Sequence, residues 1–391
     1  MTQVALCACV AIVAIFGAIV LSPWTWLRRL TLAVMAIRVL IGVGNHFYGV
    51  FVTPDALTYQ AQAMALFTGS QTHLLSAGKE GWPLFLALLF RVGGPSAFYS
   101  VLVNAVLCAL VIPLVARTAR AVLPGTERVA ATMVLLTPAW WVWGITGLRE
   151  PSIWFVALFG LLGLSEHAAS PKPSGLLMAL LSFVTMVWLR PGIAVVIAVV
   201  ACIILLFVQK SIGSFFVAVS GGVVAFLLSQ ETLSSVTMFD TTVIQQSRNS
   251  LLTAGSGFGD SSLLASTLRV LTGPWPWEIP ALGLVALPEA ISLYVILLLT
   301  LLGLRSVRIL RTAGLYMAAG VAIQLILTSG NYGTMIRIRT ICLLALVPVA
   351  AAGYQRLRQG SPKRTVEGAR RERIERHQRR STHLSRHAPG S

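Results

Sequence analysis

This sequence has few charged residues for its length. Aspartate, glutamate, lysine and arginine together make up 11% of the 391 residues, whereas an ordinary soluble domain carries about 25% of them. Hydrophobic residues make up 56% of the chain, and its mean hydropathy is +0.80. The shortage of charge excludes an ordinary soluble enzyme and predicts many membrane-spanning helices.

Acidic residues and cysteines are scarcer still. The chain has 13 aspartates and glutamates against 30 lysines and arginines, a formal net charge of +17. Its five cysteines lie in apolar runs without metal-ligand or disulfide spacing, so we interpret them as core residues. The basic residues lie mostly in short loops and in the tail, which is typical of a membrane topology signal. No nucleic-acid partner is therefore expected.

Long apolar runs fill most of the chain instead. They predict an all-α polytopic membrane protein in residues 1–354, with about eleven transmembrane helices. The predicted spans are 3–22, 30–50, 96–118, 128–147, 151–166, 174–189, 192–208, 212–229, 281–303, 312–329 and 337–354. Residues 355–391 form a basic tail that we expect to be disordered. Attraction to anionic lipids is the favoured role of this tail, and binding of RNA or a partner is the alternative.

The distribution of lysine and arginine predicts the orientation of the spans. The basic loop positions fall on one side, which the positive-inside rule makes cytoplasmic. They are Arg28, Arg29, the stretch 117–128, Lys172, Lys210, the cluster 305–311 and the tail. In the cell membrane the N-terminus then lies outside and the tail in the cytoplasm. Most acidic residues that precede the tail fall on the outer side.

Two outer loops are predicted, at 53–95 and 230–280. The first is the earliest long polar break in the chain, and its apolar segment 83–92 is too short to cross a membrane. This length favours an interfacial or re-entrant helix. The second contains GSGFGD, interpreted as a flexible loop because no strand precedes it. It also contains Trp277 in a Trp-Pro-Trp unit typical of membrane interfaces.

Asp55 is the first candidate catalytic residue. It lies in PDALTYQAQA directly after a span, where it is placed either to cap a helix or to act as a general base toward an acceptor hydroxyl. Glu150 is the second, beside Arg149 at a turn between spans. That pair is interpreted either as a local ion pair or as a site in which Arg149 binds phosphate and Glu150 orients a substrate.

Four arginines fall on the outer side, which the positive-inside rule depletes of cations. Arg149, Arg190, Arg337 and Arg339 therefore predict an anionic ligand such as a diphosphate or phosphodiester, with contact to lipid headgroups as the alternative. Further candidates for substrate contact are Tyr59, His73, Lys79, Glu80 and Trp277. His73 is favoured as an interface residue. Arg38, inside the second span, is expected to pair with other spans.

At these residues the chain resembles the GT-C class of integral-membrane glycosyltransferases. The segments that carry the resemblance are PDALTYQAQA, GWPLFLALLFRVGGPSAFYSVLVNAV, TPAWWVWGITGLREPSIWF, LRPG, GPWPWE and GNYGTMIRIRTICLLALVPVAAAG. The resemblance implies a polyprenyl-phosphate-linked sugar as donor on the outer face and a glycan, lipid or protein as acceptor. It implies Asp55 as catalytic base or metal-linked acid, Arg149 and Glu150 at the donor site, and Arg337 and Arg339 on the lipid phosphate.

The chain departs from the family pattern beside Asp55. Many relatives carry a second acid there, whereas Ala56 and Leu57 follow Asp55 in this sequence. A divalent cation is therefore the one cofactor that the resemblance leaves open, and no metal ligands are predicted. Two other functions also stay open, a polysaccharide polymerase or ligase that uses diphosphate-linked oligosaccharides and a transporter or flippase of lipid-linked sugars. A transporter is expected to show internal repeats, and none is clear.

Overall fold

The computed structural model describes residues 2–49, 53–70, 80–208, 283–308, 312–328 and 332–359, and every regular element within these ranges is a helix. The all-α prediction is therefore confirmed for the described part of the chain. The predicted span 212–229, the outer loop 230–280 and the tail beyond Gln359 lie outside the described residues. So do the candidates His73, Lys79 and Trp277.

Six helical segments in the described ranges are long and apolar enough to cross a membrane. They lie in α1 (Thr2–Leu21), α2 (Thr25–Tyr48), α5 (Phe98–Val122), α8 (Glu150–Ala169), α10 (Pro191–Ile203) with its π-helical continuation η2 (Ile204–Val208), and α17 (Tyr332–Gln359). A bilayer core needs about 20 helical residues. The chain is thus a multi-pass helical membrane protein, while the count of about eleven spans stays a prediction.

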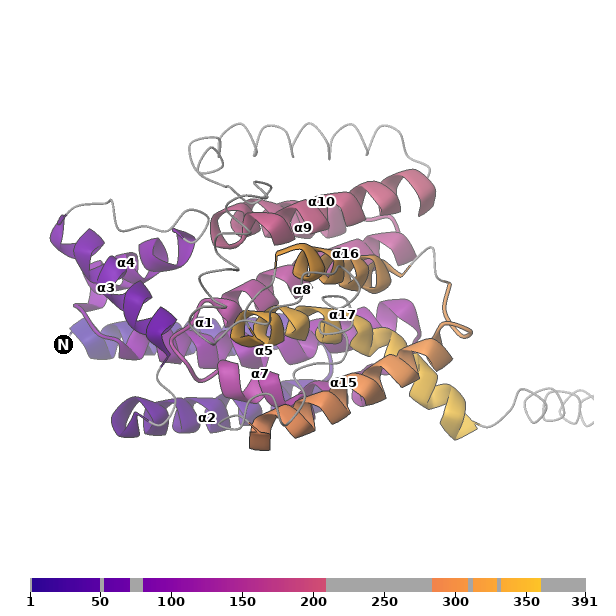
Figure 1. Ribbon diagram of the computed structural model, residues 1–391, viewed down its shortest axis with the longest axis horizontal. Helices are drawn as coiled ribbons and strands as arrows, with labels where there is room; N and C mark the ends of the chain where they lie inside the picture. Colours follow the sequence, from indigo (N-terminus) through magenta and orange to yellow (C-terminus); the bar gives the residue numbers. More distant parts are fainter. Residues whose placement is uncertain are drawn as a thin grey trace, which may run out of the picture.

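Shorter helices complete the described bundle. Four are apolar: α4 (Gly81–Gly93), α9 (Pro173–Leu189), α15 (Gly283–Gly303) and α16 (Ala313–Thr328). The remaining three are α3 (Pro54–Thr68), α6 (Glu127–Leu135) and α7 (Pro138–Trp143). The predicted short helix over 83–92 is present as α4. In Figure 1, α3 and α4 lie at the left end of the bundle, beside the beginning of α1.

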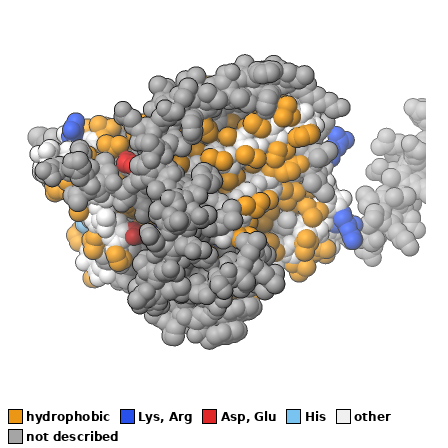
Figure 2. All heavy atoms as spheres, turned by 45° about the horizontal axis from the view of Figure 1, so that its top comes forward, with side chains coloured by type: hydrophobic (Ala, Val, Ile, Leu, Met, Phe, Trp, Pro, Cys, Tyr) orange, Lys and Arg blue, Asp and Glu red, His pale blue; other side chains and the backbone are white. Residues whose placement is uncertain are grey.

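The centre of the bundle is formed by α5 and α17. Both are buried over most of their length, whereas α1 and α2 expose large apolar side chains such as Phe16 and Leu40. On the face that Figure 2 shows, hydrophobic side chains make up most of the described surface to the right of centre, and basic side chains lie towards the two ends. This is the distribution that a lipid-exposed helical surface requires.

The predicted span 128–147 is wrong as one continuous helix. α6 ends at Leu135 and α7 begins at Pro138, with Thr137 extended between them at φ −89° and ψ 106°. Proline has no N–H to donate and disfavours the helical conformation in the residue before it, so the helix stops there. The hydropathy of this stretch is continuous, which is why the sequence pattern hides the break.

Beyond α7 the chain forms a buried non-helical turn at residues 144–149. The side chain of Asn104 donates hydrogen bonds from Nδ2 to the carbonyls of Thr146 and Leu148, at 2.5 and 2.7 Å. Trp82 of α4 donates from Nε1 to the Gly147 carbonyl at 3.3 Å. Because buried carbonyls are costly to leave unpaired, these donors fix the turn, which leads directly into Arg149 and Glu150.

Candidate functional site

Asp55 lies in the first turn of α3, but it does not cap that helix. Thr53 is the capping residue, and its hydroxyl accepts from the Ala56 amide at 3.4 Å. The Asp55 carboxylate instead accepts a hydrogen bond at 2.8 Å from Nη1 of Arg337, in the second turn of α17. The cap interpretation of Asp55 is therefore corrected. The Asp55 side chain keeps 51% of its surface exposed.

Glu150 begins α8 and meets the same guanidinium. Its Oε1 lies 3.5 Å from Nη1 of Arg337, and its side chain is only 7% exposed. The other oxygen, Oε2, is buried and has no hydrogen-bond partner among the described residues. Arg337 thus lies between two carboxylates that come from α3 and α8, separated by 95 positions in the chain. Its guanidinium is also 5.4 Å from the Trp143 ring.

Arg149 precedes Glu150 in the chain, but its guanidinium contacts the end of α9. It is buried and donates from Nη1 to the carbonyl of Leu189, the last residue of α9, at 2.8 Å. Its guanidinium lies 5.9 Å from the Tyr59 ring of α3. A local pair between Arg149 and Glu150 is therefore not what the geometry shows. Arg149 ties the start of α8 to the end of α9.

Arg190 is the link between α9 and α10. It is extended, at φ −163° and ψ 90°, because Pro191 follows it. Desolvation by burial, and then the positive charge of Arg149, lower the pKa of Arg190 to about 10. Glu150, Tyr59 and Arg337 also act electrostatically on the Arg190 guanidinium. Arg190 is therefore charged at neutral pH and lies in a place where an anion would stabilise that charge.

Tyr59 lies on α3, one helical turn after Asp55, and its ring is 5.9 Å from the Arg149 guanidinium. Its side chain is 4% exposed. Burial raises the pKa of Tyr59 to about 12, with smaller opposing contributions from the surrounding arginines and carboxylates. The phenol is consequently protonated at neutral pH and able to donate a hydrogen bond. We call these six residues the Asp55 cluster, namely Asp55, Tyr59, Arg149, Glu150, Arg190 and Arg337.

The Asp55 cluster carries three arginines against two carboxylates, a formal excess of one positive charge. Its members come from α3, α17, the start of α8 and the α9–α10 link. Guanidinium groups in a partly dehydrated site bind phosphate oxygens strongly. The arrangement is therefore suited to an anion, with the exposed carboxylate of Asp55 at its edge.

Arg339 faces away from this cluster. It is two residues from Arg337 on the same helix, and residues two apart point to opposite sides. Its guanidinium, 3% exposed, lies 3.9 Å from the carboxylate of Glu289 on α15. Glu289 also accepts from the Ala139 amide at 3.1 Å, which stabilises the start of α7. Arg337 and Arg339, predicted together, thus occupy different environments.

Glu289 is the residue that the sequence reasoning missed. It is the only acidic residue in the apolar run 281–303. An isolated acid in such a run usually has a buried partner, so its position could have marked it as a candidate. Arg38 of α2 was expected to pair with another apolar segment, and it does so at α7. Its side chain donates to the Trp140 carbonyl at 2.8 Å, and its guanidinium lies 3.6 Å from the centre of the Trp140 ring. Glu80 immediately precedes α4. Among the described residues, no contact joins Glu80 to the Asp55 cluster.

No group of three or more His, Cys, Asp or Glu side chains within the described ranges is placed to hold a metal ion. Comparison with known proteins adds no relative, since no family model, no curated protein and no solved structure matches the chain. The class that fold and site define is therefore a multi-pass helical membrane protein with a cationic cluster at one end of its bundle.

Proposed function

We propose that the chain is a membrane glycosyltransferase that moves a sugar from a polyprenyl-phosphate donor to an acceptor hydroxyl at the end of the bundle where Asp55 lies. The observation that carries this proposal is the contact of Asp55 and Glu150 with one guanidinium, that of Arg337, at 2.8 and 3.5 Å. It places an exposed carboxylate next to an anion-binding group. Sugar transfer from a phosphate needs both.

The arginines supply the donor site. Arg149, Arg190 and Arg337 lie in one field of charge, and hydrogen bonds from guanidinium to phosphate are among the strongest that proteins make. The donor's lipid chain would extend along the apolar helices while its phosphate meets the cluster. Because Arg337 already pairs with Asp55, an incoming phosphate competes for that guanidinium and frees the carboxylate.

These residues account for the proton, the new bond and the leaving group of the reaction. Asp55 accepts the proton from the acceptor hydroxyl, whose oxygen attacks the anomeric carbon. The bond from that carbon to the phosphate oxygen breaks, and polyprenyl phosphate leaves with its negative charge held by the arginines. Attack from the face opposite the leaving group inverts the anomeric centre. Glu150 positions Arg337 from the buried side, where its side chain is 7% exposed. The acceptor is a glycan, a lipid or a protein.

The test is sugar transfer from a polyprenyl-phosphate sugar in membranes that contain the full chain. Asp55→Asn keeps the shape of the side chain and removes the base, so we expect transfer to fall by about 100-fold or more. Glu127→Gln, an acidic residue at the beginning of α6 outside the cluster, is the matched control and should keep wild-type activity. Undiminished transfer by Asp55→Asn would remove the proposed base.

A second candidate is a polysaccharide polymerase or ligase with a diphosphate-linked donor. The observation that favours it is the excess of positive charge, because three arginines suit two phosphate groups at least as well as one. The same assay separates the two, since the donor is supplied once as a monophosphate-linked and once as a diphosphate-linked sugar. Transfer from the diphosphate alone would favour the second candidate.

A third candidate, a transporter or flippase of lipid-linked sugars, gains support from the buried pair of Arg339 and Glu289. The two side chains are 3% and 1% exposed, and ionisable groups inside a membrane bundle often mark a transport path. Flipping of a labelled lipid-linked sugar by the purified chain in vesicles, without sugar transfer, would favour this candidate over both enzymes.

A further inference from the structure

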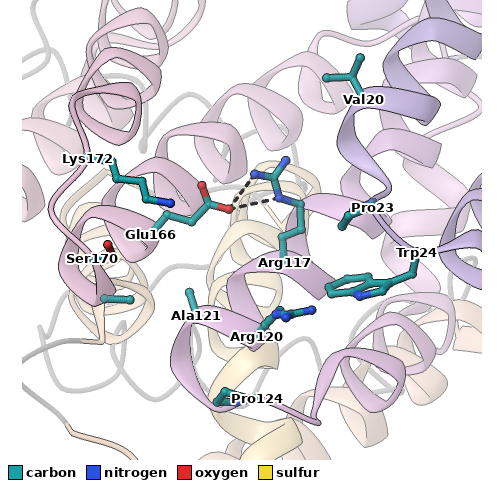
Figure 3. A pocket seen from close by; sticks show the side chains of 11 residues that line it. Val20, Pro23, Trp24, Arg117, Arg120, Ala121, Pro124, Glu166, Ser170 and Lys172 are labelled. Atoms are coloured by element: carbon teal, nitrogen blue, oxygen red, sulfur yellow. Dashed lines mark hydrogen bonds and ion pairs between the residues drawn. The ribbon is translucent and has the colours of Figure 1, made fainter.

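A cavity of about 710 Å³ opens at the end of the bundle opposite the Asp55 cluster (Figure 3). It lies where α1 and α5 end, where α2 begins and where α8 turns into α9. None of the Asp55 cluster contributes to it. Its lining residues are Val20, Pro23, Trp24, Arg117, Arg120, Ala121, Pro124, Glu166, Ala169, Ser170 and Lys172.

The polar wall of this cavity is mainly basic. Arg117 donates from Nε and Nη2 to one oxygen of Glu166, at 3.2 and 2.7 Å, and Figure 3 shows this pair in the wall. The guanidinium of Arg120 lies 5.1 Å from the Trp24 ring. Within the described ranges neither Arg120 nor Lys172 forms an ion pair through its side chain. Three cations against one carboxylate leave an excess of two positive charges.

The other wall is apolar and continues along α1. Val20, which lines the cavity, is 56% exposed. Phe16 and Ile12 precede it at intervals of four residues, so they share its helix face, and each is 66% exposed. An exposed apolar strip therefore runs from the cavity along the membrane-spanning part of α1. A phosphate ion would meet only the basic wall, whereas an acyl chain attached to that phosphate would also cover the strip.

We propose that this cavity binds the phosphate headgroup of an anionic membrane lipid, with an acyl chain against Ile12, Phe16 and Val20. Arg120 and Lys172 meet the headgroup, and Trp24, immediately before the apolar helix α2, is of the residue type that gathers at headgroup level. Basic pockets between transmembrane helices suit such lipids. The site lies at the far end of the bundle from the Asp55 cluster, so it does not depend on the proposed transfer reaction.

The experiment measures lipid binding to the purified full chain. The protein is held in nanodiscs of zwitterionic phosphatidylcholine, phosphatidylglycerol is added in steps, and native mass spectrometry counts the lipids retained. Each basic residue near an anionic headgroup contributes about five-fold to affinity. The double variant Arg120→Gln/Lys172→Gln should therefore bind phosphatidylglycerol about 25-fold more weakly. Both side chains are exposed, so the variant is expected to fold.

Two further variants sharpen the result. Glu166→Gln removes the only acidic group lining the cavity and releases Arg117, so it should bind phosphatidylglycerol about five-fold more tightly. It also loses an ion pair, so its unfolding temperature without the lipid should not rise. Arg29→Gln is the matched control, because Arg29 is an exposed arginine at the same end that does not line the cavity. It should leave affinity unchanged.

Three outcomes would overturn the proposal. One is equal binding of phosphatidylglycerol by the double variant and the wild type. Another is an equal loss in Arg29→Gln, which would mean general attraction to the basic end rather than a site. The third is full competition by inorganic phosphate at the same concentration as the lipid, which would assign the cavity to a free phosphate ion and leave the apolar strip without a role.

Discussion

At the scale of single residues, the position of a charged group along a helix decides its role. Arg337 and Arg339 were predicted together, because both lie at the start of the predicted span 337–354. The helix instead begins at Tyr332, so both lie within it and face opposite sides. The shared location of Asp55, Glu150, Arg149 and Arg190 was predictable from their places at the ends of apolar runs. Which carboxylate meets which guanidinium was not, because that depends on how helices are rotated.

Arg190 carries the clearest electrostatic prediction. Its folded-state pKa, about 10, lies below the ordinary arginine value of 12.5, so its charge costs folding free energy at every pH below about 10. That cost is relieved as the pH rises through 10. Arg190→Gln should therefore raise the unfolding temperature at pH 7 and lower affinity for an anionic donor by about 10- to 100-fold. Thermal unfolding and donor titration measure the two effects.

The control for this variant is Arg91→Gln, which removes an exposed arginine on α4. It should change neither quantity. A lower unfolding temperature in Arg190→Gln together with unchanged donor affinity would mean that Arg190 serves the packing of α9 against α10 and not an anion site.

At the scale of elements, helices were predictable from apolar runs, and their ends were less so. The short helix at 83–92 and the spans around α2, α5 and α8 follow the hydropathy, because lipid-facing and buried surfaces are both apolar. The break before Pro138 does not, since the stretch on either side stays apolar. Glu289 of α15 accepts from the Ala139 amide just after this break, and Asn104 of α5 donates to the turn that follows α7. Both partners come from distant helices, so no local pattern predicts them.

The contact between α15 and α17 depends on two glycines. A Cβ at Gly353 would clash with the carbonyl oxygen of Leu299, and one at Gly303 would clash with that of Val349. Small residues let helix backbones approach closely in this way. Gly353→Val should separate the two helices and lower stability by about 1–3 kcal/mol, seen as a lower unfolding temperature in detergent. Gly44→Val, at a position with no neighbour within 4 Å, is the control, and equal unfolding temperatures would contradict the proposed contact.

At the scale of the whole molecule, the two ends of the bundle differ in kind. One end holds carboxylates and arginines in mutual contact, and the other holds the basic cavity around Arg117, Arg120 and Lys172. Charge counting along the sequence predicted this division, because residues at alternate span ends fall on alternate sides. The cavity itself was not predictable, since its walls come from the ends of α1, α5 and α8 and from the residues that precede α2 and α9, which only the packing brings together.

The division also predicts how the chain crosses its membrane. Basic residues are retained on the cytoplasmic side, so the cavity end should face the cytoplasm and the Asp55 cluster the outside. Ser70 follows α3 and Ser170 follows α8, and both are exposed at opposite ends. In intact cells, a membrane-impermeant maleimide should label Ser70→Cys, and it should label Ser170→Cys only after permeabilisation. The unsubstituted chain, with its five native cysteines, gives the background. The reverse pattern would place the Asp55 cluster in the cytoplasm, where a donor exposed on the outer face is out of its reach.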